Sequence, residues 1–216
     1  MTVDAALIRA WVAEMAAAVA AERDHLTSLD AAIGDADHGV NLDRGFAAVT
    51  SRLAEPAGAA LGSPGAVCAL VGRTLISTVG GASGPLYGTV FREIGKSLGD
   101  AAGPDDVAFV AALQAALAGV QRLGAAQPGD KTMVDAYVPA LAALDEAVGA
   151  GQPLGTAVTG AAHAADDGAR ATVALEARKG RASYLGARSV GHQDPGATST
   201  ALLFAALRRA VEHPTR

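Results

Sequence analysis

Apolar residues recur along most of the chain at the three- and four-residue spacing of an α-helix, and strand-like alternation is nearly absent. Serine or aspartate followed by proline marks several helix starts, and glycine-rich stretches mark helix ends. These patterns predict an all-α protein. The eight expected helices span about residues 4–27, 38–53, 63–80, 84–98, 103–124, 131–148, 152–178 and 194–212.

The connections between these helices are mostly short, which favours an antiparallel up-and-down bundle. No internal repeat, low-complexity linker or charge run divides the chain, so we expect one domain over residues 1–216. In this topology, alternate connections lie at the same end. One end receives spacers such as AEPAGAALGS and DAAGP, and the other receives LDAAIGDADHG, VGGASGP, GAAQPGDK and the long connection 178–193. A ligand site is therefore expected at the second end.

Four of the expected helices begin at that end, and each helix start presents unpaired N–H groups and a partial positive charge. Three of the starts are rich in glycine, at residues 38–39, 82–84 and 194–196. Glycine lets a ligand approach the backbone closely, which favours a rim that binds anions. The alternative is that these glycines only end helices, as single glycines often do.

Three aspartates and a histidine are crowded into the stretch LDAAIGDADHGVN. Carboxylates beside an anion-binding rim would repel a phosphate unless a divalent cation lay between them, and magnesium prefers such hard oxygen ligands. A turn at Gly34 can bring Asp30, Asp35 and Asp37 together. A calcium-binding EF-hand loop is excluded because its twelfth position would be Phe46, and zinc is disfavoured because no cysteine lies nearby. The remaining alternative is a solvated loop in which Asp37 caps a helix.

The long connection 178–193 carries four basic residues and no acidic one. Arg178, Lys179 and Arg181 would bring positive charge to the same end, and an arginine can stabilise the charge that develops during phosphoryl transfer. Solubilising surface charge is the alternative for each of them, and for Arg188 in particular. Loops of this length are usually functional or mobile.

Composition and short motifs restrict the remaining classes of protein. A net charge of −5 gives no basic surface for nucleic acid, and the single cysteine fits a reducing compartment. The N-terminus lacks the features of a signal peptide and no run of about 18 uncharged apolar residues occurs, so no membrane span and a cytoplasmic location are expected. Walker A, GxGxxG and serine-nucleophile motifs are absent, so any nucleotide would be held by a helical framework.

Four stretches carry a resemblance to a known family: GDADHGVN, GGASGPLYGT, GDKTMVDA and KGRASYLGARSVGHQDPGATSTALL. They resemble the L subunit of dihydroxyacetone kinase, a unit that also forms the C-terminal domain of single-chain dihydroxyacetone kinases. The resemblance covers nearly the whole chain and implies an eight-helix antiparallel barrel with a nucleotide at one end. One departure is Ala36, which stands where the family usually has glycine between two aspartates.

The resemblance also implies roles for individual residues. Asp30, Asp35 and Asp37 would coordinate two magnesium ions under the phosphates of ADP or ATP, and Arg181 would be the catalytic residue that approaches those phosphates. The remaining residues implied to contact the nucleotide are His38, Gly39, Asn41, Ala82, Ser83, Gly124, Met133, Asp194, Pro195 and Gly196.

The resemblance implies partners as well. In this family the dihydroxyacetone is bound covalently, through a histidine, on a separate K subunit or domain, and nothing in this chain resembles that unit. A free-standing L chain favours the branch in which ADP is a retained cofactor that a phosphohistidine donor protein of the phosphotransferase system rephosphorylates. The alternatives are an ATP-dependent kinase of dihydroxyacetone or erythrulose with an exchanging nucleotide, a nucleotide-sensing module and a plain helical scaffold. The sequence is compatible with a homodimer but does not determine the oligomeric state.

Overall fold

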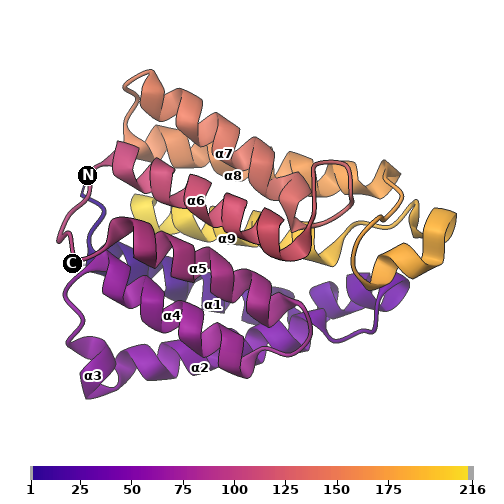
Figure 1. Cartoon of the computed structure of the whole chain (residues 1–216), viewed down its shortest axis with the longest axis horizontal. Helices are drawn as coiled ribbons and strands as arrows, with labels where there is room; N and C mark the ends of the chain where they lie inside the picture. Colours follow the sequence, from indigo (N-terminus) through magenta and orange to yellow (C-terminus); the bar gives the residue numbers. More distant parts are fainter. Residues whose placement is uncertain (1, 214–216) are drawn as a thin grey trace.

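The computed structural model describes residues 2–213, and within this range it is built from helices without strands (Figure 1). Eight described helices have 15 residues or more: α1 (Ala5–Ile33), α2 (His38–Ala54), α4 (Pro64–Thr78), α5 (Ser83–Leu98), α6 (Asp106–Gly124), α7 (Met133–Gly149), α8 (Leu154–Ala171) and α9 (Pro195–Glu212). A short helix, α3 (Pro56–Ala59), and two 3-10 segments, η1 (Thr172–Ala174) and η2 (Arg181–Ser189), lie between them. The all-α prediction is confirmed.

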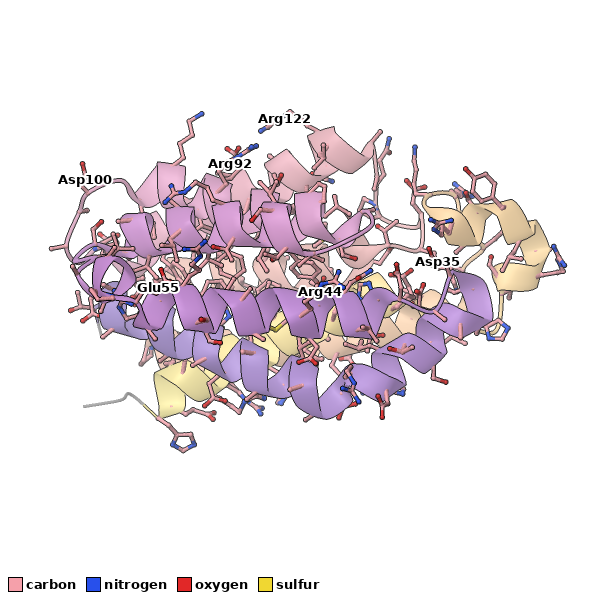
Figure 2. All side chains as sticks on the ribbon, turned by 90° about the horizontal axis from the view of Figure 1, so that it is seen from below. Asp35, Arg44, Glu55, Arg92, Asp100 and Arg122 are labelled. Carbon is pink, nitrogen blue, oxygen red and sulfur yellow. The ribbon has the colours of Figure 1, made fainter. Side chains whose placement is uncertain are left out.

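The eight long helices form a closed antiparallel ring. Each one packs against the next long helix along the chain, and α9 packs against α1, which closes the ring. The connections α1–α2, α4–α5, α6–α7 and α8–α9 lie at the right-hand end of Figure 1, and the other connections lie at the left. This is the predicted up-and-down arrangement, with the chemically suggestive connections at one end. In Figure 2, Asp35 lies at that end, and Glu55 and Asp100 lie at the opposite end.

A contiguous apolar cluster that draws on all eight long helices fills the ring. Aromatic rings occupy its centre, with the centroid of Trp11 5.4 Å from that of Phe91 and 6.0 Å from that of Phe109. The Trp11 indole N–H donates to the Leu203 carbonyl at 2.9 Å, so its one polar atom is paired inside the core. Alanine and valine supply much of the remaining volume, as the low aromatic content requires.

Helix α1 continues six residues beyond the end predicted from sequence, to Ile33. Leu26 and Ile33 are both buried and lie seven residues apart, so the apolar face of the helix continues through this segment. The helix ends where the Gly34 amide donates to the Asp30 carbonyl. Asp30 therefore lies on the last helical turn and not in a loop.

Helix α8 ends at Ala171, seven residues before its predicted end, although no glycine or proline follows there. One 3-10 turn, η1, continues the chain. The carbonyls of Thr172 and Leu175 accept hydrogen bonds from the Lys131 ammonium, which lies about 40 residues earlier in the sequence. A local pattern cannot reveal this distant donor, which explains the error.

The long connection between α8 and α9 is folded and is not an open loop. Its 3-10 segment η2 buries Ala182 against Ile33 and Ala177, with Leu185 packed beside them. The Ser189 hydroxyl accepts the Ala177 amide at 2.8 Å and donates to the Gly186 carbonyl at 2.7 Å. The connection is therefore fastened to the end of α1, beside the acidic stretch.

Helix α6 is, by length and composition alone, apolar enough to cross a membrane, and among the described residues it is the one such helix. In the fold it packs between α5 and α7 and places Phe109, Leu113 and Val120 in the core. A core helix passes the same test of composition. The absence of a membrane span therefore stays a prediction.

Helices α4 and α5 approach closely because glycines face one another along their contact. A Cβ atom on Gly72 would lie 2.8 Å from the Gly88 carbonyl oxygen and 2.9 Å from the Arg92 amide nitrogen. Both neighbours are backbone atoms that cannot turn away. The spacing of these two helices therefore depends on the missing side chain.

We predict that Gly72→Ala lowers the free energy of unfolding by about 1–3 kcal/mol, because the added methyl group must push the two helices apart. Gly160→Ala is the matched control, since Gly160 is exposed on α8 and a Cβ there would meet nothing within 4 Å. It should stabilise the protein by roughly 0.5–1 kcal/mol, as alanine does for glycine in a helix. Urea denaturation followed by circular dichroism measures both, and equal effects of the two substitutions would contradict the packing argument.

Candidate functional site

A cavity of about 340 Å³ opens at the end of the ring where the four connections meet. The starts of α2, α5, α7 and α9 contribute to its wall, together with the end of α1 and the beginning of η2. Lys179 lines it, and so do twelve of the residues to which the resemblance assigns a role: Asp30, Asp35, Asp37, His38, Ala82, Ser83, Gly124, Met133, Arg181, Asp194, Pro195 and Gly196. Segments from the two halves of the chain thus meet in one cavity.

Gly39 and Asn41 lie beside the cavity and do not line it. A Cβ on Gly39 would overlap the Arg23 carbonyl, so this glycine allows α2 to pack closely on α1. The Asn41 carboxamide accepts from the Arg44 guanidinium at 2.7 Å. Both residues have a packing role in the structure, and their contact with a nucleotide stays a prediction.

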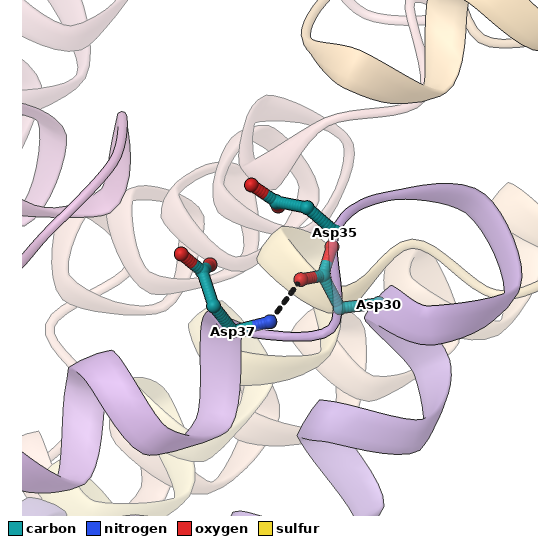
Figure 3. A group of neighbouring side chains, drawn as sticks. All are labelled: Asp30, Asp35 and Asp37. Carbon is teal, nitrogen blue, oxygen red and sulfur yellow. Dashed lines mark hydrogen bonds between the residues drawn. The ribbon is translucent and has the colours of Figure 1, made fainter.

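The three aspartates form the acidic centre of the cavity (Figure 3). One oxygen from each of Asp30, Asp35 and Asp37 can be chosen so that all three lie within 4.8 Å of one another, which suits a shared metal ion. Asp30 is buried, and one of its oxygens accepts the amides of Asp37 at 2.9 Å and His38 at 3.2 Å. These bonds tie the end of α1 to the start of α2. The carboxylates of Asp35 and Asp37 are more accessible to a cation.

The turn between α1 and α2 depends on two unusual backbone positions. A Cβ on Gly34 would overlap the Asp30 carboxylate, so only glycine leaves room for that side chain. Ala36 has a φ of 62°, in the left-handed region that glycine adopts without strain. Alanine in this conformation costs about 1–2 kcal/mol. The sequence departure at Ala36 thus falls at a position where the backbone itself favours glycine.

Arg181 lines the cavity directly beside the acidic centre. Its guanidinium Nε is 2.7 Å from a carboxylate oxygen of Asp35, and both side chains are substantially exposed, at 68% and 37%. An exposed ion pair of this kind contributes at most about 1 kcal/mol to stability, so Arg181 can leave Asp35 for a stronger partner. Arg181, which the sequence analysis expects to approach the phosphates, therefore lies beside Asp35, an expected metal ligand.

His38 begins a chain of buried hydrogen bonds that runs from the cavity into the core. Its Nδ1 is 3.0 Å from the Ser83 hydroxyl, and its Nε2 is 2.9 Å from the Ser199 hydroxyl. The Ser199 hydroxyl also lies 3.1 Å from the Gly196 carbonyl oxygen, and when its one hydrogen is donated to that carbonyl, the histidine Nε2–H is the donor to Ser199. Tyr87 lies 2.7 Å beyond Ser199 and completes the chain.

This chain determines the state of the imidazole. Burial lowers the pKa of His38, against the opposing charges of Asp30 and Asp37, which favours the neutral ring. With the proton on Nε2, Nδ1 accepts the hydroxyl hydrogen of Ser83. The Ser83 oxygen then offers its lone pairs to the cavity. Tyr87 and Ser199 had been noticed only as parts of the stretches GGASGPLYGT and KGRASYLGARSVGHQDPGATSTALL, and their contact with His38 was not predicted because each belongs to an ordinary helical pattern.

Asp194 and Lys131 are two buried ionisable residues in the wall of the cavity. Asp194 caps α9 by accepting the Ala197 amide at 2.7 Å. Burial raises the pKa of Asp194 to about 7, aided by the nearby charge of Asp135 and opposed by that hydrogen bond and by Lys131. Lys131 had been noticed only as part of the stretch GDKTMVDA, and its position in the wall was not predicted.

The arrangement can bind a cation and an anion together. Four helix starts offer N–H groups and partial positive charge, and the aspartates offer hard oxygen ligands a few ångströms away. Leu86, Val120, Ala126 and Met133 provide an apolar part of the wall. A phosphorylated ligand with a planar apolar group, carried together with a divalent cation, matches these surfaces.

Comparisons with known proteins agree with this geometry. The family model of the DAK2 domain matches residues 32–209. The chain is 38% identical over 202 residues to "PEP-dependent dihydroxyacetone kinase, ADP-binding subunit DhaL" of Escherichia coli (strain K12), covering 94% of this chain and 95% of that protein. It is 39% identical over 207 residues to the subunit of the same description from dihydroxyacetone kinase 1 of Listeria innocua, covering 96% and 97% of the two chains.

Longer proteins match over one part of their length. D-erythrulose kinase of Mycolicibacterium smegmatis is 37% identical over 192 residues, which are 87% of this chain and 32% of that protein. The crystal structure of the dihydroxyacetone kinase from C. freundii in complex with AMP-PNP and Mg²⁺ superposes with a TM-score of 0.73 at 29% identity. The superposition covers 97% of this chain and 34% of that one, so this chain spans about a third of that protein.

The raised pKa of Asp194 leads to a prediction about stability. The raised pKa means that the native state holds this proton up to about pH 7, whereas the unfolded chain releases it near the ordinary aspartate pKa of 3.8. Protonation of Asp194 therefore contributes fully to the free energy of unfolding below the pKa of the unfolded chain. This contribution is lost as pH rises toward 7, and the free energy of unfolding falls by at most about 1.4 kcal/mol per pH unit. Asp194→Asn should remove this slope while keeping an acceptor for the helix cap.

Urea denaturation of the ligand-free protein at several pH values between about 4 and 8 measures the difference between wild type and variant. The comparison of the two proteins cancels the contributions of the other carboxyl groups. Parallel curves of stability against pH would show that Asp194 is already ionised in the native state at low pH.

Proposed function

The chain belongs to the DAK2-domain family, and from this premise we propose that it is the nucleotide-binding subunit of a dihydroxyacetone kinase. Membership of this family makes it a kinase subunit, a phosphotransferase. The observation that carries the proposal is the cavity in which three aspartates converge beside four helix starts. We further propose that residues 1–216 form one such domain and that it acts in the cytoplasm.

Asp30, Asp35 and Asp37 are proposed to hold two magnesium ions. Three carboxylates within 4.8 Å form a hard-oxygen donor set, which suits magnesium together with phosphate oxygens and water. The bound metal would neutralise charge on the phosphates of the nucleotide. One oxygen of Asp30 is already engaged by two backbone amides, so Asp35 and Asp37 supply most of the free ligand atoms.

The nucleotide is proposed to lie with its phosphates at the helix starts and its base against the apolar wall. The N–H groups at the starts of α5 and α9 would donate to phosphate oxygens, near Ser83 and Gly196. Leu86 and Met133 lie on the part of the wall that would cover the adenine, with Gly124 leaving room beside them. His38, Ala82, Asp194 and Pro195 complete the proposed pocket, and Gly39 and Asn41 would support it from behind.

Arg181 is proposed as the catalytic residue. It lies at the mouth of the cavity, where it can leave Asp35 and donate to the γ-phosphate once a cation occupies the aspartates. A guanidinium in this position stabilises the negative charge that develops on the transferred group. Catalysis by this chain would otherwise consist of positioning the donor.

The acceptor is proposed to be dihydroxyacetone, or a similar small hydroxyketone, held on a separate K subunit. The γ-phosphoryl group would pass to its hydroxyl oxygen and leave ADP in the cavity. A phosphohistidine donor protein of the phosphotransferase system would then return a phosphoryl group to ADP. The names of the E. coli and Listeria relatives, which describe ADP-binding subunits, support this retained-cofactor mode.

The second candidate is an ATP-dependent kinase whose nucleotide exchanges in each turnover. The similarity to the D-erythrulose and L-erythrulose kinases of Mycolicibacterium smegmatis, over 87% and 88% of this chain, favours it. Denaturing the purified protein and identifying the released nucleotide separates the two modes. Nearly one ADP per chain supports the retained cofactor, and an empty site that binds and releases Mg-ATP supports exchange. Protein that binds neither nucleotide with magnesium would refute both.

We predict that Asp35→Ala lowers the affinity for Mg-ADP by at least about tenfold, because a metal ligand is lost from the acidic centre. Asp35 is exposed and makes no contact with the core, so the helical content should not change. Asp100→Ala, at the opposite end of the ring, is the matched control and should bind as wild type does (Figure 2). Calorimetry measures the affinities and circular dichroism the helical content. Equal affinity of both variants would overturn the site assignment.

A further inference from the structure

Lys131 is a buried lysine in the wall of the cavity for which the proposed function gives no role. Its side chain is 1% exposed, and it immediately precedes Thr132, the residue that caps α7. Its φ is 61°, a left-handed conformation that disfavours any residue with a Cβ. Burial also lowers the pKa of Lys131, against the charges of Asp194 and Asp135. Strain and burial both oppose a lysine here, so its contacts must compensate for them.

The ammonium group of Lys131 donates to three backbone carbonyls. The acceptors are Thr172 at 2.6 Å, Leu175 at 3.1 Å and His192. An ammonium group has three protons, so all of its donors are used. Although Lys131 lines the cavity, it has no donor left for a phosphate, which distinguishes it from a phosphate-binding lysine.

The three carbonyls belong to the two ends of the connection that carries Arg181. Thr172 and Leu175 lie where this connection leaves α8, and His192 lies where it enters α9. Lys131 therefore joins both ends of the connection to the start of α7.

Backbone hydrogen bonds reinforce this junction. The Arg178 amide donates to the Asp130 carbonyl at 3.0 Å, and the Gly191 amide donates to the Val173 carbonyl at 2.8 Å. Both bonds span the same junction, but each joins only two segments of the chain. The Lys131 ammonium, whose residue immediately precedes the cap of α7, bonds to both ends of the connection at once.

We propose that Lys131 is a positioning residue that holds the connection so that Arg181 stays over Asp35 and the phosphate end of the cavity. The proposal rests on the proposed function in assigning a use to Arg181, but the junction itself does not depend on it. A tetrahedral ammonium suits three converging carbonyls, whereas the planar guanidinium of an arginine does not. The effect reaches the acidic centre through Arg181, which lies 2.7 Å from Asp35.

The first test measures the junction in the ligand-free protein. Lys131→Met keeps the length of the side chain but removes its donors, and Lys96→Met makes the same change at an exposed position on α5. Hydrogen exchange should become at least about tenfold faster in residues 176–191 of the first variant, with α4, α5 and α6 unchanged. Unchanged exchange in that segment, or equal acceleration in all helices, would overturn the proposal. If Lys131→Met does not fold, Lys131→Gln, which keeps two donors, should show a smaller acceleration confined to the same segment.

The second test asks whether Lys131 acts through Arg181. Manganese binding to the nucleotide-free protein, followed by electron paramagnetic resonance, reports on the aspartates. Because Arg181 competes with a cation for Asp35, Arg181→Gln should bind manganese roughly two- to fivefold more tightly. Lys131→Met should give the same gain, and adding it to Arg181→Gln should give no further gain.

The outcomes separate the possibilities. Additive gains would mean that Lys131 acts on the aspartates by its own charge, and no gain in either variant would mean that Arg181 does not occupy Asp35 in solution. Either result overturns the positioning role. If wild type binds no manganese with or without ADP, the proposed metal site fails, and the hydrogen-exchange result still decides whether Lys131 holds the connection.

Discussion

The antiparallel alternation of the helices is the constraint on which the rest of the molecule depends. Because each long helix reverses the direction of the one before, α2, α5, α7 and α9 all begin at one end, and their unpaired N–H groups converge on one cavity. Such a convergence attracts anions. Asp30 satisfies two of these amides from within the protein, so neither Asp35 nor Asp37 is needed for them, and Asp35 is paired only with the exposed Arg181. The cavity therefore offers both signs of charge to a ligand.

Burial separates the charged groups of the cavity into fixed and exchangeable ones. The Arg181–Asp35 pair is exposed, so water can replace either partner at little cost. Lys131 is almost entirely buried, and each carbonyl it leaves would lose its partner. Arg181 and Lys131 thus differ in role because the contacts of the arginine can be exchanged and those of the lysine cannot. The exposed arginine suits a step in which partners change, and the buried lysine suits a permanent junction.

The sequence predicted what depends on local pattern. Helical periodicity indicated the helices, short connections indicated their antiparallel order, and alternation of the connections placed Asp30, Asp35 and Asp37 at the same end as the glycine-rich helix starts. The sequence did not predict contacts between segments that are far apart along the chain. The end of α8 depends on Lys131, and the state of His38 depends on Ser199, which lies 161 residues away. Ser199 is an ordinary residue of α9 and Lys131 lies just before the cap of α7, so only the assembled structure distinguishes them.

The turn between α1 and α2 shows how distant and local constraints combine. The chain must reverse within residues 34–37, and the left-handed backbone at Ala36 is what places Asp35 and Asp37 on the same side of the turn. A glycine would adopt this conformation without strain, but it would also leave the unfolded chain freer. The two hydrogen bonds to Asp30 over-determine the turn and compensate for the strain of alanine. The geometry of the acidic centre therefore depends less on whether residue 36 is alanine or glycine than on the hydrogen bonds that the Asp30 carboxylate accepts.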